Sequence, residues 1–324
     1  MGEFDLIARY FRRPVQRAAL GVGDDCALLQ VGAGMQLAVS TDMLIEGRHF
    51  LSTVQPSRLG HKALAVNLSD LAACGARPLA FTLALALPQV DPIWLEAFAS
   101  GLLALADLHG CELVGGDTTR GPLSICITVF GEVPAGQALL RSGARAGDDV
   151  YVSGTLGDAR LALEAFRGTL WLPAAALTSA RNRMEQPTPR LALGVALRGI
   201  ASAAIDISDG LLGDLGHILQ ASGVGASIET ATALDLIAVR PDGASPASGY
   251  TLDKQLEYVL AGGDDYELVF TAAPQQRSAV QHAAGQSQTP VTRIGRVEAT
   301  PGVRLLDDQG RALPNRYAGF DHFG

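Results

Sequence analysis

The sequence predicts an α/β protein of two domains. Short runs of β-forming residues, each bounded by turn residues, predict strands at 35–40, 79–87 and 124–130. Between them lie longer patterns in which apolar residues recur every three or four positions, as in amphipathic helices. A chain of 324 residues, 48% of them hydrophobic, is long enough for two domains with cores of their own.

Helix boundaries are readable in the first half of the chain. Pro56 opens a helical pattern that runs through Ala73, and Gly75 follows as a C-terminal stop. Pro92 opens a second pattern, whose apolar positions continue to Leu108. We therefore expect two helices interleaved with the three strands.

A polar, glycine-containing break at 141–149 separates the halves, so we expect domains of 1–144 and 145–324. The second half predicts a strand, a helix, a helix opened by Pro189, a strand, and a helix with Ser208 as its N-cap. These elements are expected at 150–153, 157–166, 189–198, 203–207 and from 208 onward. A polar insertion at 240–249 is expected on the surface, and the chain ends in an aromatic-rich tail.

Composition excludes several classes of function. The net charge is −8 and no run is rich in Lys or Arg, which argues against nucleic acid or an anionic membrane as partner. The four cysteines form no Cys-x-x-Cys pair, so neither a zinc site nor a disulfide framework is expected. The N-terminus does not resemble a signal peptide, and the longest apolar stretch, 79–87, is too short to cross a bilayer. We expect a soluble, cytoplasmic protein.

Six short segments share one pattern, an apolar or glycine-rich lead followed by one or two aspartates. They end at Asp25, Asp42, Asp70, Asp117, Asp209 and Asp265. Asp favours caps and turns, and in four of the segments Gly stands beside it, which lets the backbone of a loop pass close to a ligand. If the loops converge, the carboxylates would repel one another unless cations neutralised them, and an all-oxygen set favours Mg²⁺. Such a site is typical of phosphoryl transfer.

Each aspartate also has a purely structural interpretation. Any of them could be a cap or a turn former, and Asp209 could simply favour the positive end of its helix. Asp148 and Asp149 are interpreted as ordinary turn residues. The spacing alone indicates a metal-dependent enzyme acting on phosphate compounds.

The familiar nucleotide and hydrolase motifs are absent. The sequence contains no Gly-x-x-x-x-Gly-Lys-[Ser/Thr] loop, no protein-kinase signature and no Gly-x-Ser-x-Gly elbow. An aspartyl-phosphate phosphatase is disfavoured because no Asp-x-Asp-x-[Thr/Val] motif occurs. Any ATP would therefore bind in an unusual way, anchored by metal.

In order along nearly the whole chain, these segments resemble the thiamine-monophosphate kinase family. The resemblance is carried by segments 21–29, 40–42, 46–50, 62–73, 115–124, 141–144, 206–211, 262–268 and 319–323. It implies a two-domain fold like that of aminoimidazole-ribotide synthase. In that fold the N-terminal domains of two subunits form a joint β-barrel, an α/β domain follows, and ATP and metals lie in the groove between domains. It also implies a homodimer that transfers the ATP γ-phosphoryl group to thiamine monophosphate, with Mg²⁺ as cofactor.

The resemblance assigns roles to individual residues. The metal positions are Asp25, Ser40, Thr41, Asp42, Asp70, Asp117, Asp206 and Asp209. The nucleotide positions are Gly116, Asp117, Arg141 and Ser208. The substrate positions are His49, Asp264 and Phe320, where family members often carry Glu and Tyr at the last two. On the structural interpretation His49 is a surface or capping residue, Phe320 packs in a core and Arg141 is a solvated loop residue.

The reaction is expected to be an in-line transfer without a covalent enzyme intermediate, because the acceptor is already an ionised phosphate oxygen. Three alternatives stay open. Two are sister activities, those of aminoimidazole-ribotide and selenophosphate synthases. Selenophosphate synthases need a reactive Cys or Sec near the N-terminus, whereas the first cysteine here, Cys26, follows the Asp pair. The third is a non-catalytic nucleotide-binding relative.

Overall fold

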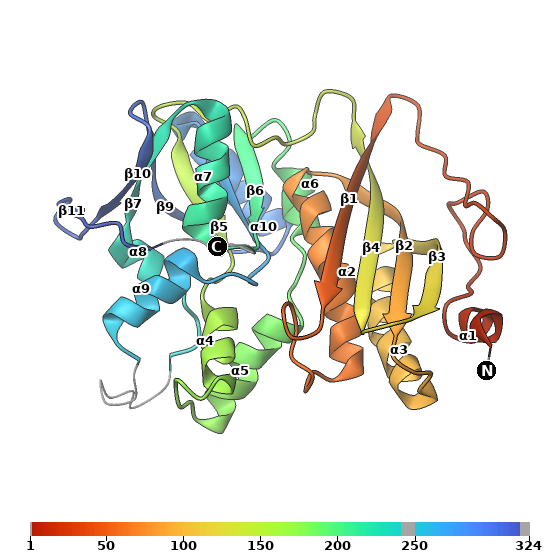
Figure 1. Ribbon diagram of the computed structural model, residues 1–324. Coiled ribbons are helices and arrows are strands. Elements are labelled where there is room, and N and C mark those ends of the chain that lie inside the picture. Colours follow the sequence, from red (N-terminus) through yellow and green to blue (C-terminus); the bar gives the residue numbers. More distant parts are fainter. Residues whose placement is uncertain (1, 241–249, 318–324) are drawn as a thin grey trace. The chain divides into compact units, whose positions relative to one another are not determined.

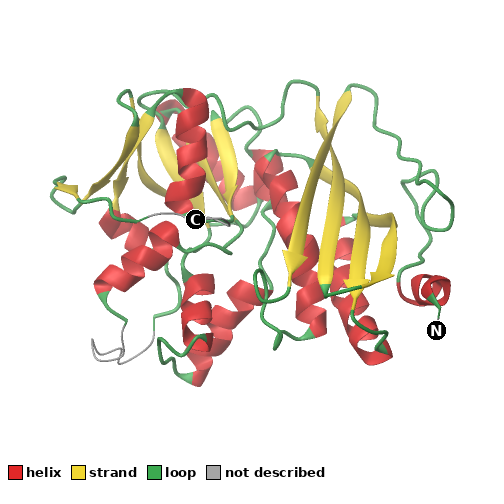
Figure 2. Ribbon diagram, viewed as in Figure 1, coloured by secondary structure: helices red, strands yellow, loops and turns green. Residues whose placement is uncertain are grey.

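The computed structural model describes residues 2–240 and 250–317, except the side chains of residues 3 and 4 (Figure 1). The chain divides into two compact units. Unit 1 comprises Met1–Leu71 and Ala76–Ala138, and unit 2 comprises Ala72–Gly75 and Leu139–Gly324. Both units combine helices with a sheet (Figure 2), which confirms the predicted α/β class. Across the described residues, no helix is both long and apolar enough to span a membrane.

Unit 1 is built on a four-stranded sheet in the order β1-β4-β2-β3. The β2 and β3 strands are parallel, and the other neighbouring pairs are antiparallel. The strands are β1 (Met35–Ile45), β2 (Arg77–Leu87), β3 (Glu112–Arg120) and β4 (Ser124–Pro134). The helices are α1 (Glu3–Tyr10), α2 (Pro56–Ala73) and α3 (Pro92–His109). The sheet is open, with β1 and β3 as its edges.

Helices α2 and α3 cover one face of this sheet (Figure 1). Alternate side chains of β4, such as Ile125 and Ile127, are buried there, since successive side chains of a strand point to opposite faces. The other face is not covered in the same way along β1. Its apolar side chains Leu37, Val39, Met43 and Ile45 are between 41% and 54% exposed. Unit 1 thus has a conventional core on one side and an exposed apolar strand on the other.

Unit 2 contains a seven-stranded mixed sheet in the order β11-β10-β7-β9-β5-β8-β6. Its strands are β5 (Asp149–Ser153), β6 (Ala203–Ile207), β7 (Gly225–Glu229), β8 (Glu267–Ala272), β9 (Val291–Glu298), β10 (Gly302–Leu306) and β11 (Ala312–Leu313). Its helical elements are α4 (Asp158–Phe166), α5 (Ala174–Glu185), α6 (Leu191–Ala196), α7 (Leu211–Ser222), α8 (Thr230–Leu234), α9 (Leu252–Ala261), η2 (Pro274–Gln276) and α10 (Arg277–Gln286). Every residue of β5, β6 and β8 is buried, so the middle of this sheet is covered on both faces.

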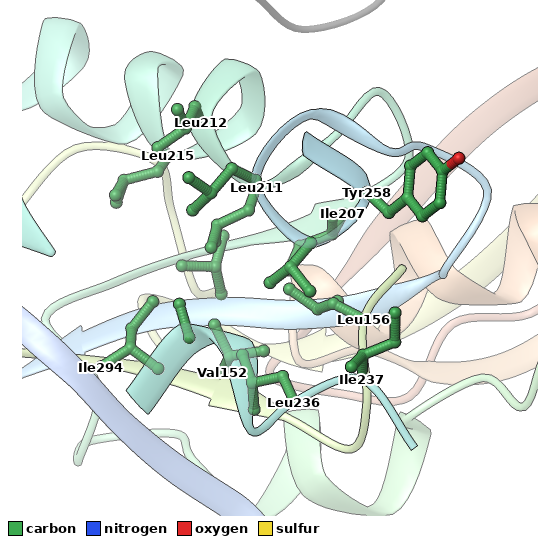
Figure 3. Packing of buried hydrophobic residues seen from close by; sticks show 14 of the residues in the cluster. Val152, Leu156, Ile207, Leu211, Leu212, Leu215, Leu236, Ile237, Tyr258 and Ile294 are labelled. Atoms are coloured by element: carbon green, nitrogen blue, oxygen red, sulfur yellow. The ribbon is translucent and has the colours of Figure 1, made fainter. Parts of the chain in front are cut away.

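One hydrophobic cluster fixes α7 on this sheet. Leu211 and Leu215 of α7 pack with Ile207 of β6 and Val152 of β5 (Figure 3). All four of these side chains are fully buried, and burying a Leu or Ile side chain contributes about 1.5–3 kcal/mol. The cluster therefore holds the end of β6 and the start of α7 as one rigid corner.

Some of the element boundaries predicted from the sequence are confirmed, and others are wrong. The strand at 203–207 and the helix at 56–73 are found with those bounds. The predicted N-cap Ser208 is wrong: α7 begins at Leu211, with Gly210 as its N-cap at φ 115°. Asp149 is not a turn residue but the buried first residue of β5, whereas Asp148 is buried and closes a turn, its N–H donating to the Arg145 carbonyl at 2.9 Å. The insertion at 241–249 and the tail beyond residue 317, with Phe320, lie outside the described residues.

Candidate functional site

In unit 1, three of the predicted metal ligands gather where α2 crosses β1. Ser40 and Asp42 share one face of β1, and both are half-buried. The Ser40 hydroxyl donates a 2.5 Å hydrogen bond to Asp70 Oδ2 on α2. The backbone N–H of Asp42 donates to Asn67 Oδ1 at 3.0 Å, one helical turn before Asp70. Asn67 is itself buried and bonds to the Ala63 carbonyl, so this corner of the strand has a fixed geometry.

The other two predicted ligands of the sheet, Thr41 and Asp117, lie on the opposite face. The Thr41 hydroxyl is 2.8 Å from the Thr128 hydroxyl of β4. Asp117 pairs in register with Ala84, and that row continues through Cys126 to Met43 on β1. Asp117 is thus three strand spacings from β1, or about 14 Å. The structure does not bring Asp117 and Asp42 together within one chain.

The predicted nucleotide contact Gly116 has a structural reason to be glycine. Its φ is 145°, and a Cβ there would lie 1.8 Å from the Leu83 carbonyl oxygen of β2. Only glycine permits this approach of the two strands. The next residue, Asp117, is exposed on the surface of the sheet.

Asp25 and His49 lie on turns of unit 1. Asp25 is exposed, two residues after Gly23, which has φ 128°. His49 is half-buried, and its Nδ1 accepts the Ile45 backbone N–H at 3.0 Å. The neutral ring then carries its proton on Nε2. The ring of His49 thus holds the turn that follows β1 against the end of that strand.

In unit 2, the predicted residues gather where β6 ends and β8 begins. These two strands pair antiparallel, with Ile207 opposite Glu267. Asp206 is buried within β6, whereas Ser208 and Asp209 follow it on a half-buried turn. Asp264 lies on the adjacent segment, and its N–H donates to the Ser208 carbonyl at 2.8 Å. Asp264 has φ 74°, a left-handed conformation that costs about 1 kcal/mol or more outside glycine.

A buried charge network underlies Asp264. The Glu267 carboxylate has no exposed surface and accepts hydrogen bonds from Arg183 at 2.7 Å and from Arg190 at 2.5 and 2.6 Å. Asp265 is also buried, and its Oδ2 accepts the Gly157 N–H at 2.9 Å. Burial raises the pKa of Asp265 well above its ordinary value. Sequence reasoning gave Glu267 and its two arginine partners no role, although an acid opening the apolar strand 267–272 signals a buried cation partner.

The segment that carries Arg141 is fixed by its backbone. The Leu140 carbonyl accepts the Ala204 N–H of β6 at 2.9 Å. At the end of α7, Ser222 Oγ accepts the N–H groups of Gly143 and Ala144 at 3.1 and 3.2 Å. The Arg141 side chain is exposed. A permanently charged fork on a fixed backbone suits a phosphate ligand.

Four of the proposed aspartate ligands lie inside regular elements, and for Asp70 and Asp206 these are the helix and strand predicted at 56–73 and 203–207. Asp42, Asp117 and Asp206 are within strands, and Asp70 is within a helix. Asp70 tolerates its position in a helix because its carboxylate accepts the Ser40 hydroxyl of a neighbouring strand. Among the described residues, no three His, Cys, Asp or Glu side chains converge on one point. The oxygen donors fit Mg²⁺, which takes few protein carboxylates and completes its shell with water and phosphate.

Comparison with known proteins agrees with this fold. Residues 23–133 match the family model of the AIR synthase related protein N-terminal domain, and residues 145–308 match that of its C-terminal domain. The chain is therefore one of the AIR synthase related proteins. The HypE hydrogenase maturation protein in complex with ATP, 21% identical with a TM-score of 0.76, shares the fold.

Relatives of higher sequence identity show which family within the AIR synthase related proteins the chain belongs to. The thiamine-monophosphate kinase of Salmonella typhimurium is 47% identical over 99% of this chain and 98% of its own. The crystal structure of the Stenotrophomonas maltophilia enzyme, at 46% identity and a TM-score of 0.82, covers 96% of both chains. AaThiL complexed with AMPPCP and TMP is 31% identical with a TM-score of 0.76, over 91% of this chain and 89% of its own. The chain belongs to the thiamine-monophosphate kinase family.

Proposed function

We propose that this protein transfers the γ-phosphoryl group of ATP to thiamine monophosphate, giving thiamine diphosphate and ADP. The observation that carries the proposal is the similarity over nearly the whole chain to AaThiL, a protein complexed with AMPPCP and TMP. The predicted ligand residues support it, because they form two ordered groups of oxygen donors, one in each unit. A phosphate oxygen of the acceptor forms the new bond to the γ-phosphorus while the bond to ADP breaks.

The unit 1 group would hold the cation. Ser40, Asp42 and Asp70 offer oxygen atoms on one face of β1 and the adjoining helix. Bound Mg²⁺ would offset negative charge on the phosphates. The ordered hydrogen bonds around these side chains keep them in place before the ligand arrives, which lowers the cost of binding. Asp25, Thr41 and Asp117 are further proposed ligands, exposed on turns or on the outward face.

The unit 2 group would hold the reactants. Asp206 and Asp209 offer oxygen atoms for further cations, and Ser208 is the proposed nucleotide contact between them. Arg141 would bind phosphate through its guanidinium group, and Gly116 of unit 1 is a further proposed nucleotide contact. Asp264 would attract the cationic thiazolium ring of the substrate, and His49 and Phe320 are further proposed substrate contacts.

We also propose a homodimer formed through the outward face of the unit 1 sheet. The apolar side chains of Leu37, Val39, Met43 and Ile45 form an exposed stripe along β1. Contiguous apolar surface of this kind marks interaction sites. A second copy is the partner that best fits a strand lacking charged side chains on that face. Cytoplasmic localisation fits the use of ATP.

A product assay tests the proposed function. Purified protein would be mixed with ATP, Mg²⁺ and thiamine monophosphate, with unphosphorylated thiamine as a parallel substrate. We expect thiamine diphosphate and ADP from the monophosphate only, and no product after a chelator is added. Absence of product, with the Mg²⁺–ATP complex still bound, would reject this function and favour one of the sister activities of the fold.

A further inference from the structure

A single carboxylate oxygen of α7 organises the turn that bears Ser208 and Asp209. Asp214 Oδ2 accepts the backbone N–H groups of Ser208, Asp209 and Gly210 at 3.0, 3.1 and 3.1 Å. The side chain is buried, with 3% of its surface exposed. Three consecutive amides directed at one oxygen fix both the path of the turn and the direction in which its side chains point.

The helix explains why Asp214 can do this. Side chains of an α-helix tilt toward its N-terminus, so an acid at the fourth position of α7 reaches back to the residues before the first turn. The positive end of the helix dipole also favours a negative charge there. The next core residue, Leu215, and Leu211 before it are fully buried, which holds the helix against the sheet (Figure 3).

The turn held by Asp214 in turn holds the segment that carries Asp264. The Ser208 carbonyl accepts the Asp264 N–H at 2.8 Å, and the Ile207 carbonyl accepts the Tyr266 N–H at 2.9 Å. Gly263 is needed for this approach, because a Cβ there would lie 2.4 Å from the Ser208 carbonyl oxygen. The turn at 208–210 and the segment at 262–266 are therefore joined by hydrogen bonds, and neither can shift without breaking one of them.

We propose that Asp214 is a positioning residue that couples the nucleotide-binding turn at 208–210 to the substrate-binding segment at 262–266. The proposal rests on the proposed function for the identity of the two ligands. Asp214 itself touches neither ligand; it acts through the Ser208–Gly210 backbone and the Ser208 carbonyl. Loss of its carboxylate then weakens the binding of both reactants rather than of the nucleotide alone.

Amide hydrogen exchange followed by mass spectrometry tests the coupling without any substrate. In Asp214→Ala, we expect exchange at 208–210 to accelerate by about ten-fold or more, because three hydrogen bonds to one buried oxygen are lost. Exchange at 264 should accelerate with it, through the Ser208 carbonyl. Asp214→Asn keeps one acceptor oxygen and should show a smaller increase. Acceleration confined to 208–210 would overturn the coupling, and no acceleration would overturn the positioning role.

Kinetics on the same variants separates positioning from a general loss of structure. In Asp214→Ala, the KM values for ATP and for thiamine monophosphate should both rise by about ten-fold or more, with a smaller change in kcat. The matched control is Asp149→Asn, which also removes a buried carboxylate of unit 2 but one that pairs with Arg277 and Arg293. It should leave both KM values and the exchange at 208–210 unchanged. A rise in one KM alone would reject the coupling.

The product assay and the exchange experiment test the proposed function and the positioning role independently. If the unaltered protein makes no thiamine diphosphate, the proposed function is wrong, while the exchange data still decide whether Asp214 holds the two segments together. If the protein is active and the exchange pattern is absent, only the positioning role is wrong.

Discussion

Asp70 shows how a polar residue can be tolerated inside a helix. Its neighbours Leu68 and Leu71 are buried core residues, while its carboxylate reaches β1 and accepts the Ser40 hydroxyl. Helix interiors disfavour Asp because its side chain competes for backbone hydrogen bonds. A partner on another element removes that competition and aligns the carboxylate with Asp42. An aspartate at position 70 is therefore better explained by ligand binding than by helix stability.

Replacing Asp70 with Asn tests that interpretation. The amide keeps the size of the side chain and an acceptor for Ser40, but it removes the charge that a cation needs. We expect kcat to fall by more than about 100-fold at ordinary Mg²⁺, with a change in unfolding free energy within about 1 kcal/mol. Turnover and urea denaturation measure the two quantities.

The control is Asp107→Asn, which removes an exposed carboxylate paired with Arg13. It should leave both quantities nearly unchanged. Normal turnover in Asp70→Asn would exclude the residue from the metal site.

Single residues also show what the sequence could and could not predict. The segment 206–211 was identified as functional, yet its N-cap was assigned to Ser208. The structure instead uses Gly210, because the Asp214 carboxylate takes the amides that a serine cap would have satisfied. A side chain six residues after Ser208 decides this, and the helix propensities of the residues near Ser208 do not report it. The same holds for Glu267, whose arginine partners lie 77 and 84 residues away in the chain.

At the scale of elements, the strands β1, β2 and β4 and the helices α2 and α3 of unit 1 were predicted, whereas β3 was not. Strands at 79–87 and 124–130 are β-rich over their whole lengths, and the structure extends them to 77–87 and 124–134. The β3 strand contains Gly115, Gly116 and Asp117, three residues that disfavour strands. Its pairing with β2 overrides that preference, and Gly116 is required by the close approach of Leu83. Local patterns cannot anticipate a strand that is fixed by its neighbour.

The exposed face of β1 allows the proposed dimer to be tested by mutation. Val39 is 54% exposed in the chain and would be buried in the proposed dimer. Val39→Glu places a charge in that interface, and the cost of burying an unpaired charge should dissociate the dimer. Sedimentation equilibrium would show a shift from dimer toward monomer.

Leu108→Glu is the matched control, because Leu108 is 74% exposed on α3, on the other side of the sheet. It should leave the oligomeric state unchanged. If Val39→Glu and the unaltered chain had the same mass in solution, β1 would not be the dimer surface.

At the scale of the whole molecule, the acid side of the stability profile should depend on Asp149. Hydrogen bonding by Arg277 is the main cause that lowers the pKa of this carboxyl below its ordinary value, and Arg293 adds to it. A carboxyl whose pKa is lowered in the folded state contributes stability above its unfolded pKa of about 3.9. That contribution is lost as the pH falls through the lower, folded pKa.

Denaturation of Asp149→Asn as a function of pH tests whether this carboxylate stabilises the fold at neutral pH and loses that effect in acid. At neutral pH the variant should be less stable by about 2 kcal/mol, the usual size of a hydrogen bond to a charged group. The difference should shrink toward zero below pH of about 4. A difference that stays constant down to strong acid would contradict the assigned cause.

Direct transfer of the γ-phosphoryl group to thiamine monophosphate can be followed with an isotope label. The protein would be incubated with Mg²⁺, thiamine monophosphate and ATP carrying ¹⁸O in the γ-phosphoryl group, and the products would be weighed by mass spectrometry. We expect the label to appear in the terminal phosphoryl group of thiamine diphosphate. Label found only in free phosphate, with thiamine monophosphate unchanged, would contradict it.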